Sequence, residues 1–296
     1  FFSLLVHSNP MSEPASKRAK TEAKAEEALE QEPTAACVPS GQCQFTETWT
    51  HVKLLHHTSQ SHDTILLTFA CPDEGKALGL STCACLLARF QVECGDDVVR
   101  PYTPVSTNAR VGSFQLLVKV YEGGKMSQHM KHMSIGDTLE FCHNRAKNVK
   151  MQYPFHYDHV AMLVGGTGIT PMLQALHAIL GTEDDTTQVT LLFGNKTQED
   201  ILCQDLLDRW AAAFPDRLNV VHVLSQADGD PTWTGPKGHI DAALITKHVP
   251  ASTEDVLVMV CGPPPMYDAL CGERMDPDLS GALSDLGYGE DQVYKF

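Results

Sequence analysis

A glycine-rich turn is the first segment of the chain whose residue types suggest binding chemistry. It reads GGTGITPM at 165–172 and directly follows a continuous apolar run at 160–164. Glycines let backbone amides approach a pyrophosphate, Pro171 suits the first turn of a helix, and a helix N-terminus attracts phosphate. The segment lacks the GxGxxG spacing of the common dinucleotide fingerprint, so a plain tight turn remains an alternative. We interpret it as the cradle of a dinucleotide phosphate.

A proline-rich segment follows another apolar run near the end of the chain. It reads CGPPPM at 261–266, after the run at 256–261. Three successive prolines fix φ and remove three donors, which makes either a stiff turn or a rigid wall for a cofactor. We favour the wall, with Cys261 near a nicotinamide. No histidine is adjacent in sequence to activate this thiol, so we expect Cys261 to position the ring and not to act as a nucleophile.

Two further segments combine charge, an aromatic ring and backbone amides. In RPYTP at 100–104, two prolines hold an extended chain that directs Arg100 and Tyr102 along one surface. Arginine pairs with a diphosphate, and tyrosine stacks on a flat ring. The segment GGKMS at 123–127 offers amides, a cation and a hydroxyl at the start of a helix. It is therefore a second candidate phosphate cradle.

The elements that must position these segments change character along the chain. From 45 to 145 the strand-like runs at 64–69, 113–121 and 138–141 are separated by turns, which is typical of an antiparallel barrel. After Tyr153-Pro154, apolar strands alternate with helices. The expected strands are 160–164, 189–193, 219–224 and 256–261, and the expected helices are 198–213, 239–248 and 264–271. This alternation predicts a parallel sheet with helices on both faces, which binds dinucleotides at the carboxyl ends of its strands.

The fold class expected is therefore β plus α/β, in three parts. Residues 1–44 are expected to be disordered, because 11–40 are rich in Ala, Glu, Lys, Pro and Ser and poor in large apolar residues. An antiparallel β-barrel domain is expected at 45–150. An α/β dinucleotide-binding domain is expected at 151–296.

Composition limits the classes of protein to which the chain can belong. The net charge of −15 argues against nucleic-acid binding, and no stretch reaches the roughly 20 apolar residues of a membrane span. The apolar run at 1–6 is too short to span, so we expect membrane association only through an anchor missing upstream. The chain has ten cysteines. Cys83 and Cys85 lack the second cysteine pair that a zinc site needs, so we expect no metal. We expect all the cysteines to be thiols, which indicates a reducing compartment.

Charge is distributed unevenly within this acidic chain. Between 100 and 150, eight lysines and arginines stand against three acidic residues, a net charge of +5. These cations are either scattered surface residues or a docking patch for an acidic partner.

Taken in order, the motifs resemble those of the NADH–cytochrome b5 reductase family, within the ferredoxin–NADP reductase-like group. The resemblance covers 45–296 and includes SHDT at 61–64 and VYKF at 293–296. It implies an FAD-binding barrel and an NAD(P)-binding α/β domain. It also implies that a hydride passes from NADH to FAD and that single electrons pass to cytochrome b5 or a similar acidic haem protein.

The resemblance also implies roles for individual residues. Arg100 would meet the FAD pyrophosphate, Tyr102 would flank the isoalloxazine ring, and Thr103 would hydrogen-bond near its N5. Thr103 and Cys261 are the implied catalytic residues. The other implied cofactor-binding residues are Arg100, Pro101, Tyr102, Lys119, Tyr121, Gly124, Lys125, Met126, Ser127, Gly165, Gly166, Thr167, Gly168, Thr170, Pro171, Ser225, Gly262, Pro263, Pro264 and Met266. His62 matches a histidine near the flavin in relatives, and a surface histidine is an equal alternative.

The chain departs from the family pattern at three places. The Leu-Pro-x-Gly-x-His segment of relatives is replaced at 78–85, and a Gly-Pro pair is replaced by CHNR at 142–145. Where NADH-preferring relatives carry Asp, this chain has Ser225. Because the acidic Asp228 and Asp230 follow and no arginine does, we expect a preference for NADH, weaker than in relatives, with NADPH as the alternative donor.

The remaining expectations concern partners and location. We expect a monomer in the cytoplasm or on the cytoplasmic face of an organelle membrane. Two alternative functions remain open at this point. One is a non-catalytic flavin-binding interaction protein, and the other is the reductase module of a larger enzyme such as a nitrate reductase.

Overall fold

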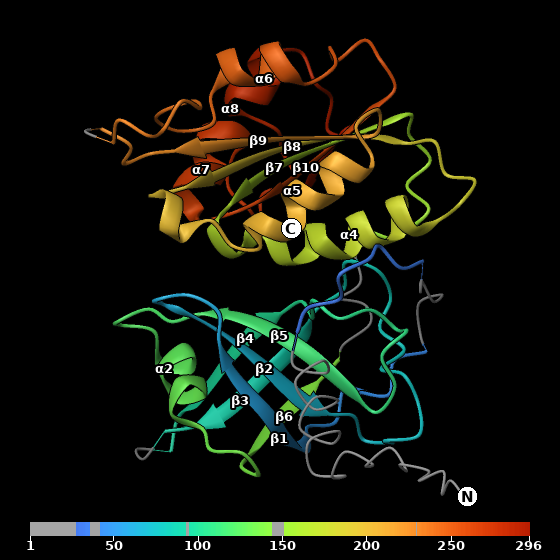
Figure 1. Cartoon of the computed structure of the whole chain (residues 1–296), viewed down its shortest axis with the longest axis vertical. Helices are drawn as coiled ribbons and strands as arrows, with labels where there is room; N and C mark the ends of the chain where they lie inside the picture. Colours follow the sequence, from blue (N-terminus) through green and yellow to red (C-terminus); the bar gives the residue numbers. More distant parts are fainter. Residues whose placement is uncertain (1–27, 36–41, 93–94, 144–150, 229) are drawn as a thin grey trace, which may run out of the picture.

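Two sheets, one antiparallel and one parallel, form the two halves of the computed structural model (Figure 1). It describes residues 28–35, 42–92, 95–143, 151–228 and 230–296. Among these residues, no helix has the length and apolar character that crossing a membrane requires. The change from antiparallel to parallel pairing falls after Tyr153-Pro154, as the sequence predicts.

The first half is a six-stranded antiparallel sheet with the strand order β4-β3-β6-β1-β2-β5. Its elements are β1 (Thr50–Ser59), β2 (Thr64–Ala70), β3 (Leu86–Gln91), β4 (Asp97–Tyr102), β5 (Ser113–Lys119), α2 (Lys125–His132) and β6 (Thr138–Cys142). Every side chain of β2 is buried, because one face meets the barrel core and the other meets neighbouring segments. The expected antiparallel fold is confirmed, with β4 and β5 at the two ends of the strand order.

Aromatic rings fill the core of this antiparallel domain. Phe69 lies 5.0 Å from Phe141 between ring centroids, and Phe114 lies 5.2 Å from Phe141 in an edge-to-face arrangement. Helix α2 adds Met126 and Met130, both fully buried. The rings alternate with outward-facing residues along their strands, so the core fixes the strand register. This register in turn fixes where β4 and β5 present their end residues.

The second half is a five-stranded parallel sheet with the order β11-β10-β7-β8-β9. Its elements are β7 (His159–Gly165), η1 (Gly166–Gly168), α4 (Ile169–Gly181), β8 (Gln188–Asn195), η2 (Gln198–Asp200), α5 (Gln204–Ala213), β9 (Leu218–Leu224), α6 (Ala242–His248), β10 (Val256–Cys261), α7 (Pro264–Leu270), α8 (Gly281–Asp285) and β11 (Val293–Lys295). The parallel sheet with helices on both faces confirms the α/β expectation.

The helix expected at 198–213 is divided in two. The short turn η2 starts with a capping box, in which Thr197 and Asp200 each satisfy the other's backbone amide. Cys203 then adopts a left-handed conformation with φ of 57°, which interrupts the helix before α5 begins. Asp200, at the end of η2, pairs with Lys119 of the first domain.

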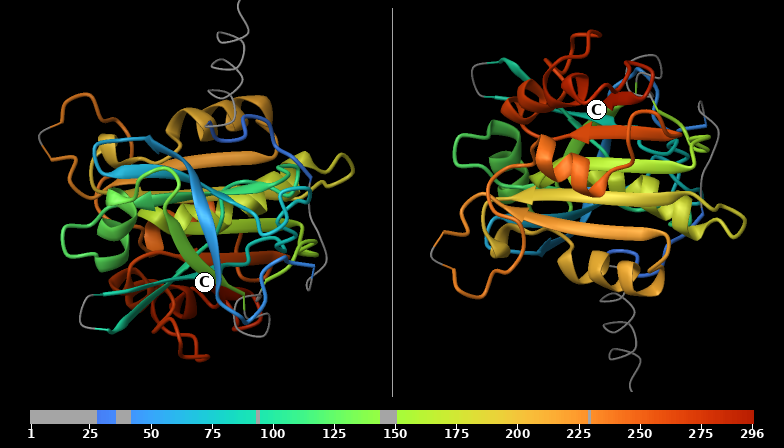
Figure 2. Two further views of the ribbon diagram at one scale, coloured as in Figure 1. Left: turned by 90° about the horizontal axis from the view of Figure 1, so that it is seen from below. Right: turned by 90° about the horizontal axis from the view of Figure 1, so that it is seen from above.

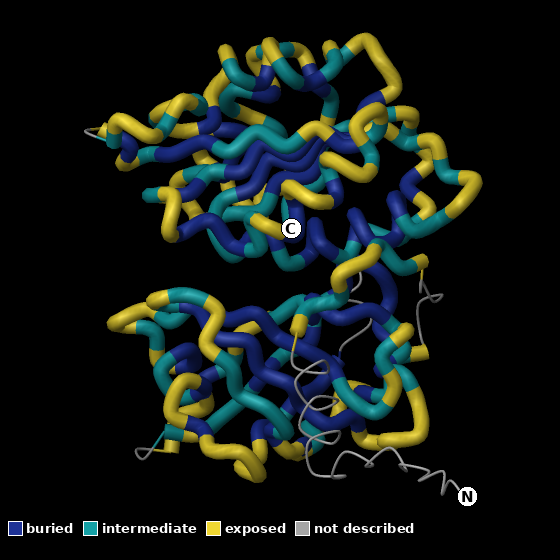
Figure 3. Tube along the Cα trace, in the orientation of Figure 1, coloured by how far each residue is buried: buried dark blue, intermediate teal, exposed yellow. Residues whose placement is uncertain are grey.

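Helices cover the two faces of the parallel sheet differently (Figure 2). Helices α4 and α5 lie on the face that meets the antiparallel domain, whereas α6, α7 and α8 lie on the opposite face. The buried side chains of α4 pack in one cluster with Leu66 of β2 and Leu117 of β5. Apolar packing therefore joins the two domains directly. Figure 3 shows the trace coloured by burial, with buried segments in both domains.

The expected disorder of 1–44 does not hold for the part of this segment that the structure describes. Residues 1–27 and 36–41 lie outside the described residues. Segment 28–35 packs along the junction between the domains, where Leu29 joins the interdomain cluster. At 42–44, the Gln44 side chain accepts a hydrogen bond from the Asp73 amide at 2.7 Å. The prediction of disorder from amino-acid composition was wrong for these residues, because neighbouring elements supply their packing and hydrogen-bond partners.

Candidate active site

A cavity of about 1240 Å³ lies between the two sheets. It is lined by the ends of β4 and β5 and by the carboxyl ends of β7, β8, β9 and β10. Most of the residues predicted from sequence meet there: Pro101, Tyr102, Thr103, Lys119, Tyr121, Gly165, Gly166, Thr167, Gly168, Thr170, Pro171, Ser225, Cys261, Gly262, Pro263 and Met266. Segments distant in sequence therefore form one cavity, at the sheet edge where such folds bind dinucleotides.

The glycine-rich turn contacts the proline-rich segment inside this cavity. A Cβ on Gly168 would lie 2.1 Å from the Cys261 carbonyl oxygen, and one on Gly165 would lie 2.8 Å from Pro263 Cδ. Gly166 adopts φ of 53°, which residues with a side chain rarely adopt. The turn thus needs glycine for close packing at Gly165 and Gly168 and for its backbone conformation at Gly166.

Cys261 ends β10 at the floor of the cavity. Burial raises the pKa of its thiol to about 11, and a hydrogen bond with Tyr267 opposes this shift. The thiol is therefore protonated at neutral pH and is a poor nucleophile. The Tyr267 hydroxyl donates to the Phe296 carbonyl oxygen at 2.6 Å, which ties the chain end to the same wall.

The RPYT segment reaches the cavity from the other domain. Tyr102 pairs with Leu86 of β3, and Pro101, Tyr102 and Thr103 line the cavity. Burial raises the pKa of the Tyr102 phenol to about 12, so the ring is neutral and its hydroxyl can donate. Arg100 is exposed, lies outside the cavity lining and donates to the Val99 carbonyl oxygen at 2.7 Å.

The GGKMS segment lies beside the cavity and does not line it, and Pro264 also lies outside the lining. Met126 is buried in the barrel core. The Ser127 hydroxyl accepts from the Tyr121 amide at 3.2 Å and donates to the Gly124 carbonyl oxygen at 3.1 Å. Lys125 is exposed at the start of α2. A phosphate role for this segment remains a prediction, because its hydroxyl already has partners within the turn.

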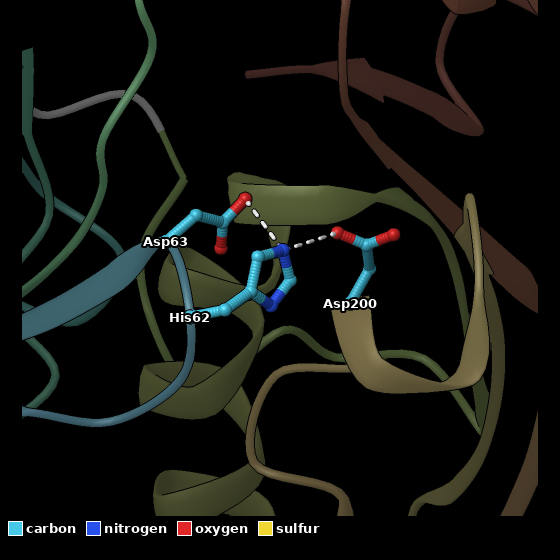
Figure 4. Close-up of side chains that lie close together, drawn as sticks. All are labelled: His62, Asp63 and Asp200. Atoms are coloured by element: carbon cyan, nitrogen blue, oxygen red, sulfur yellow. Dashed lines mark ion pairs between the residues drawn. The ribbon is translucent and has the colours of Figure 1, made fainter.

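Lys119 connects the two domains at one side of the cavity. Its ammonium group lies 2.7 Å from Asp63 Oδ2 and 2.8 Å from Asp200 Oδ1. Burial alone would raise the pKa of both carboxyl groups, but hydrogen bonds from Lys119 lower the pKa of each below its usual value. His62 Nε2 lies 3.5 Å from Asp63 and 3.8 Å from Asp200 (Figure 4). The Lys119 ammonium pairs with both carboxylates, so these residues form an ion-pair network between the domains.

Sequence reasoning missed several residues that line the cavity. They include Cys83, Cys85, Leu87, Asn195, Lys196, Asp200, Tyr294 and Phe296. Cys83 and Cys85 lie in the segment that departs from the family pattern, and Cys83 has φ of 63°. Among the described residues, Asn195 Nδ2 and Tyr294 Oη are buried without a hydrogen-bond partner. The sequence signals for these positions were the VYKF ending, for Tyr294 and Phe296, and the departure at 78–85, for Cys83 and Cys85.

Comparison with known proteins identifies the family to which this chain belongs. Residues 51–146 match the oxidoreductase FAD-binding domain, and 162–272 match the oxidoreductase NAD-binding domain. The chain is 38% identical over 263 residues to NADH-cytochrome b5 reductase 2 of Scheffersomyces stipitis, covering 87% of each chain. The chain belongs to the NADH-cytochrome b5 reductase family. It is therefore an FAD- and NAD(P)H-dependent flavoprotein oxidoreductase.

Two other relatives agree with this assignment. NADH-cytochrome b5 reductase 2 of Saccharomyces cerevisiae is 39% identical over 253 residues, with 84% of this chain and 83% of the relative covered. Among solved structures, the cytochrome b5 reductase domain of Ulva prolifera nitrate reductase superimposes with a TM-score of 0.75 at 28% identity. The match covers 86% of this chain and 100% of that domain.

The residues present fit both cofactors of the family. The packed glycines of the 165–168 turn leave backbone amides close to the sheet edge, which suits a dinucleotide phosphate. On the opposite wall, the neutral phenol of Tyr102 offers a stacking surface for a flat ring. The unpartnered Asn195 Nδ2 and Tyr294 Oη, both from cavity-lining residues, provide donors for bound ligands.

We expect Arg100→Ala to weaken FAD binding more than tenfold. Arg100 is exposed, directly precedes the cavity-lining Pro101, and would have to exchange its hydrogen bond to the Val99 carbonyl oxygen for one to a diphosphate. A charge-assisted hydrogen bond is worth about 1.5–3 kcal/mol. The measurement is the FAD dissociation constant by flavin fluorescence, with Arg110→Ala as the control from the same domain. Full flavin occupancy and an unchanged dissociation constant in Arg100→Ala would show that Arg100 does not contact FAD.

Proposed function

We propose that the chain passes electrons from NADH through FAD to cytochrome b5 or a closely similar acidic haem protein. The proposal rests on one observation: a single cavity joins the Tyr102–Thr103 wall to the glycine-rich turn and to Cys261. FAD, when bound, supplies the conversion of a two-electron donor into single electrons. The names of the two fungal relatives described above support cytochrome b5 as the acceptor.

The protein's contribution is to bind and orient the two cofactors. Hydride transfer needs close stacking of two rings and no acid–base residue, so positioning determines the rate. Thr103 and Tyr102 would hold the flavin ring from the barrel side. Gly168, Cys261 and Pro263 would hold the nicotinamide from the sheet side, where the protonated Cys261 thiol gives an uncharged surface.

The decisive experiment follows the flavin spectrum of the purified protein. The protein should be yellow, should bleach when NADH is added without oxygen, and should regain colour when oxidised cytochrome b5 is added. A yellow protein that does not bleach would support the alternative of a non-catalytic flavin-binding protein. Bleaching without reoxidation by cytochrome b5 would instead support a different acceptor, such as another module of a larger enzyme.

The acceptor is proposed to dock on the basic segment at 100–150. Within it, Arg100, Lys125 and Lys131 are exposed on the antiparallel domain, whereas 144–150 lie outside the described residues. Opposite charges on the partner would speed encounter, and this effect weakens as salt shortens the Debye length, about 10 Å at 0.1 M. A docking role therefore predicts a strong salt dependence with an acidic acceptor.

We expect Lys131→Glu to raise KM for cytochrome b5 severalfold at low salt, with little change in turnover of a neutral dye. Lys131 is exposed on α2 and is not part of the cavity lining, so NADH oxidation itself should be preserved. Lys247→Glu makes the same charge change on α6, on the far face of the other domain, and serves as the control. Equal effects of the two variants on KM would exclude a local docking patch.

The family assignment leaves oligomeric state and location to be proposed. The eight cysteines among the described residues are all free thiols, which supports a reducing compartment. We therefore propose that the protein lies in the cytoplasm or on the cytoplasmic face of an organelle membrane. We also propose that it is a monomer. Light scattering of the FAD-loaded protein tests the monomer directly.

A further inference from the structure

Residues 28–35 form a strap along the junction between the two domains, next to α4 and α5 (Figures 1 and 2). On the α/β side, Trp210 Nε1 of α5 donates to the Gln31 carbonyl oxygen at 2.8 Å. The Thr34 amide donates to His177 Nδ1 of α4 at 3.1 Å. Burial lowers the pKa of His177 to about 4, so the ring is neutral at physiological pH and can accept this bond.

The last residue of α4 is Gly181, and its lack of a side chain leaves room for the strap. A Cβ on Gly181 would lie 2.6 Å from the Ala35 nitrogen and 2.8 Å from backbone atoms of Thr34. Real Cβ atoms do not approach backbone atoms this closely, so only glycine lets the strap lie here. The helix therefore ends on the one residue type that leaves room for this segment.

On the antiparallel side, the strap is held by the Glu30 carboxylate and by a longer contact, in which Gln115 Nε2 donates to the Ala28 carbonyl oxygen at 3.4 Å. The Thr107 amide donates to Glu30 Oε1 at 2.9 Å, and the Thr107 hydroxyl donates to Glu30 Oε2 at 2.7 Å. Thr107 is buried, with 7% of its surface exposed. Two hydrogen bonds to one ionised group at a partly buried site make this the strongest polar contact of the strap.

The segment that Glu30 holds is the continuation of the flavin motif. Residues 104–107 follow Thr103 directly. From the other domain, the Gln174 side chain of α4 donates to the Pro104 and Ser106 carbonyl oxygens at 2.8 and 2.7 Å. The loop is thus fixed from one side by α4, which begins at the glycine-rich turn, and from the other by the strap. These contacts link the elements that line both cofactor sites.

We propose that the strap sets the relative position of the two domains and that Glu30 is a positioning residue for the transfer between the cofactors, acting through Thr107. The inference rests on the flavin reduction proposed above. Ring-to-ring transfer is sensitive to displacement, since a shift of about 1 Å can cost up to roughly 100-fold in rate. Releasing the loop from Glu30 removes its anchor to the strap and leaves the anchors to α4 and to β5, where the Val105 amide donates to the Gln115 carbonyl oxygen at 2.9 Å. The separation of Tyr102 and Thr103 from the nicotinamide wall is then held less tightly.

The test compares Glu30→Ala, Glu30→Gln and Glu32→Ala in the FAD-saturated full chain. Glu32 is an exposed residue of the same strap whose carboxylate makes no hydrogen bond or ion pair within the described part of the chain, so it is the matched control. In rapid mixing with saturating NADH, Glu30→Ala should lower the limiting rate of flavin reduction about tenfold, with KM for NADH nearly unchanged. Glu30→Gln keeps an acceptor for the Thr107 amide and should recover most of the rate.

A second readout needs no cofactor. Amide hydrogen exchange of the peptide containing Thr107 should accelerate about tenfold in FAD-free Glu30→Ala and stay unchanged in Glu32→Ala. The double variant Glu30→Ala/Thr107→Val should reduce flavin no more slowly than Glu30→Ala alone, because both changes break the same link.

Each outcome separates the inference from the proposed function. If the wild type is not reduced by NADH, the proposed function fails. If the wild type is reduced and Glu30→Ala matches it in limiting rate, the positioning role is wrong. A lower melting temperature with an unchanged rate at 25 °C would also overturn it, because the strap would then contribute only to stability.

Discussion

Replacing Gly168 with alanine is expected to lower kcat/KM for NADH by roughly 100-fold while FAD stays bound. The added methyl would lie 2.1 Å from the Cys261 carbonyl oxygen and 2.5 Å from its carbonyl carbon. Both are backbone atoms of a central strand end, so no flexible side chain can move away. The turn or the CGPPP segment must shift, and shifts of about 1 Å at a reacting centre cost up to this much in rate.

The experiment measures flavin content, kcat/KM for NADH and thermal stability of Gly168→Ala. Gly123→Ala is the matched control, because Gly123 lies in the other glycine pair and a Cβ there would meet nothing within 4 Å. The unfolding free energy should fall by about 1–3 kcal/mol in Gly168→Ala and hardly change in Gly123→Ala. A Gly168→Ala enzyme with wild-type NADH kinetics would show that this turn does not carry the nicotinamide dinucleotide.

Much of the fold could be predicted from the sequence because its signals are local. The apolar run before the glycine-rich turn became β7, and the turn led directly into α4. The alternation of strands and helices after 154 required a parallel sheet, and its helices indeed cover both faces. The continuous helix expected at 198–213 was wrong, because the left-handed Cys203 interrupts it and no glycine marks the break.

The site was predictable where motifs are contiguous and not where contacts are long-range. Gly165–Gly168 and Cys261–Pro263 meet as expected, because both follow strands of one sheet. The strap at 28–35 gave no signal, because its composition resembles that of disordered segments and its partners lie about 80 to 180 residues away in sequence. Lys196 was missed because nothing in its own segment shows that it ends beside Ser225.

The choice between NADH and NADPH depends on the ends of β8 and β9, which lie side by side in the structure. The Ser225 amide donates to the Asn195 carbonyl oxygen at 2.9 Å, and the Gln226 amide donates to that of Lys196 at 2.8 Å. Lys196 and Ser225 both line the cavity, whereas Asp228 and Asp230 do not. Asp230 accepts from the Thr232 amide and hydroxyl at 2.8 and 2.6 Å. Asp230 is thus engaged within its own turn, Asp228 lies outside the cavity lining, and the exposed Lys196 lies near the serine.

We therefore expect NADH to be preferred over NADPH by less than about tenfold, and the preference to depend on Ser225 and Lys196. Ser225→Asp should lower kcat/KM for NADPH more than tenfold and change that for NADH little, because a carboxylate repels the 2′-phosphate and accepts from a ribose hydroxyl. Lys196→Gln should also reduce NADPH use selectively, and the effect should shrink as salt screens the charge.

Thr197, next to Lys196, is engaged with Asp200, so Gln198→Ala on the exposed side of the same turn is the better control. Because like charges at contact cost several kcal/mol and tenfold is about 1.4 kcal/mol, the Ser225→Asp effect should be easy to resolve at fixed ionic strength. If NADPH use is equal in wild type and Ser225→Asp, the end of β9 does not face the adenosine ribose and the placement of the dinucleotide along this edge is wrong.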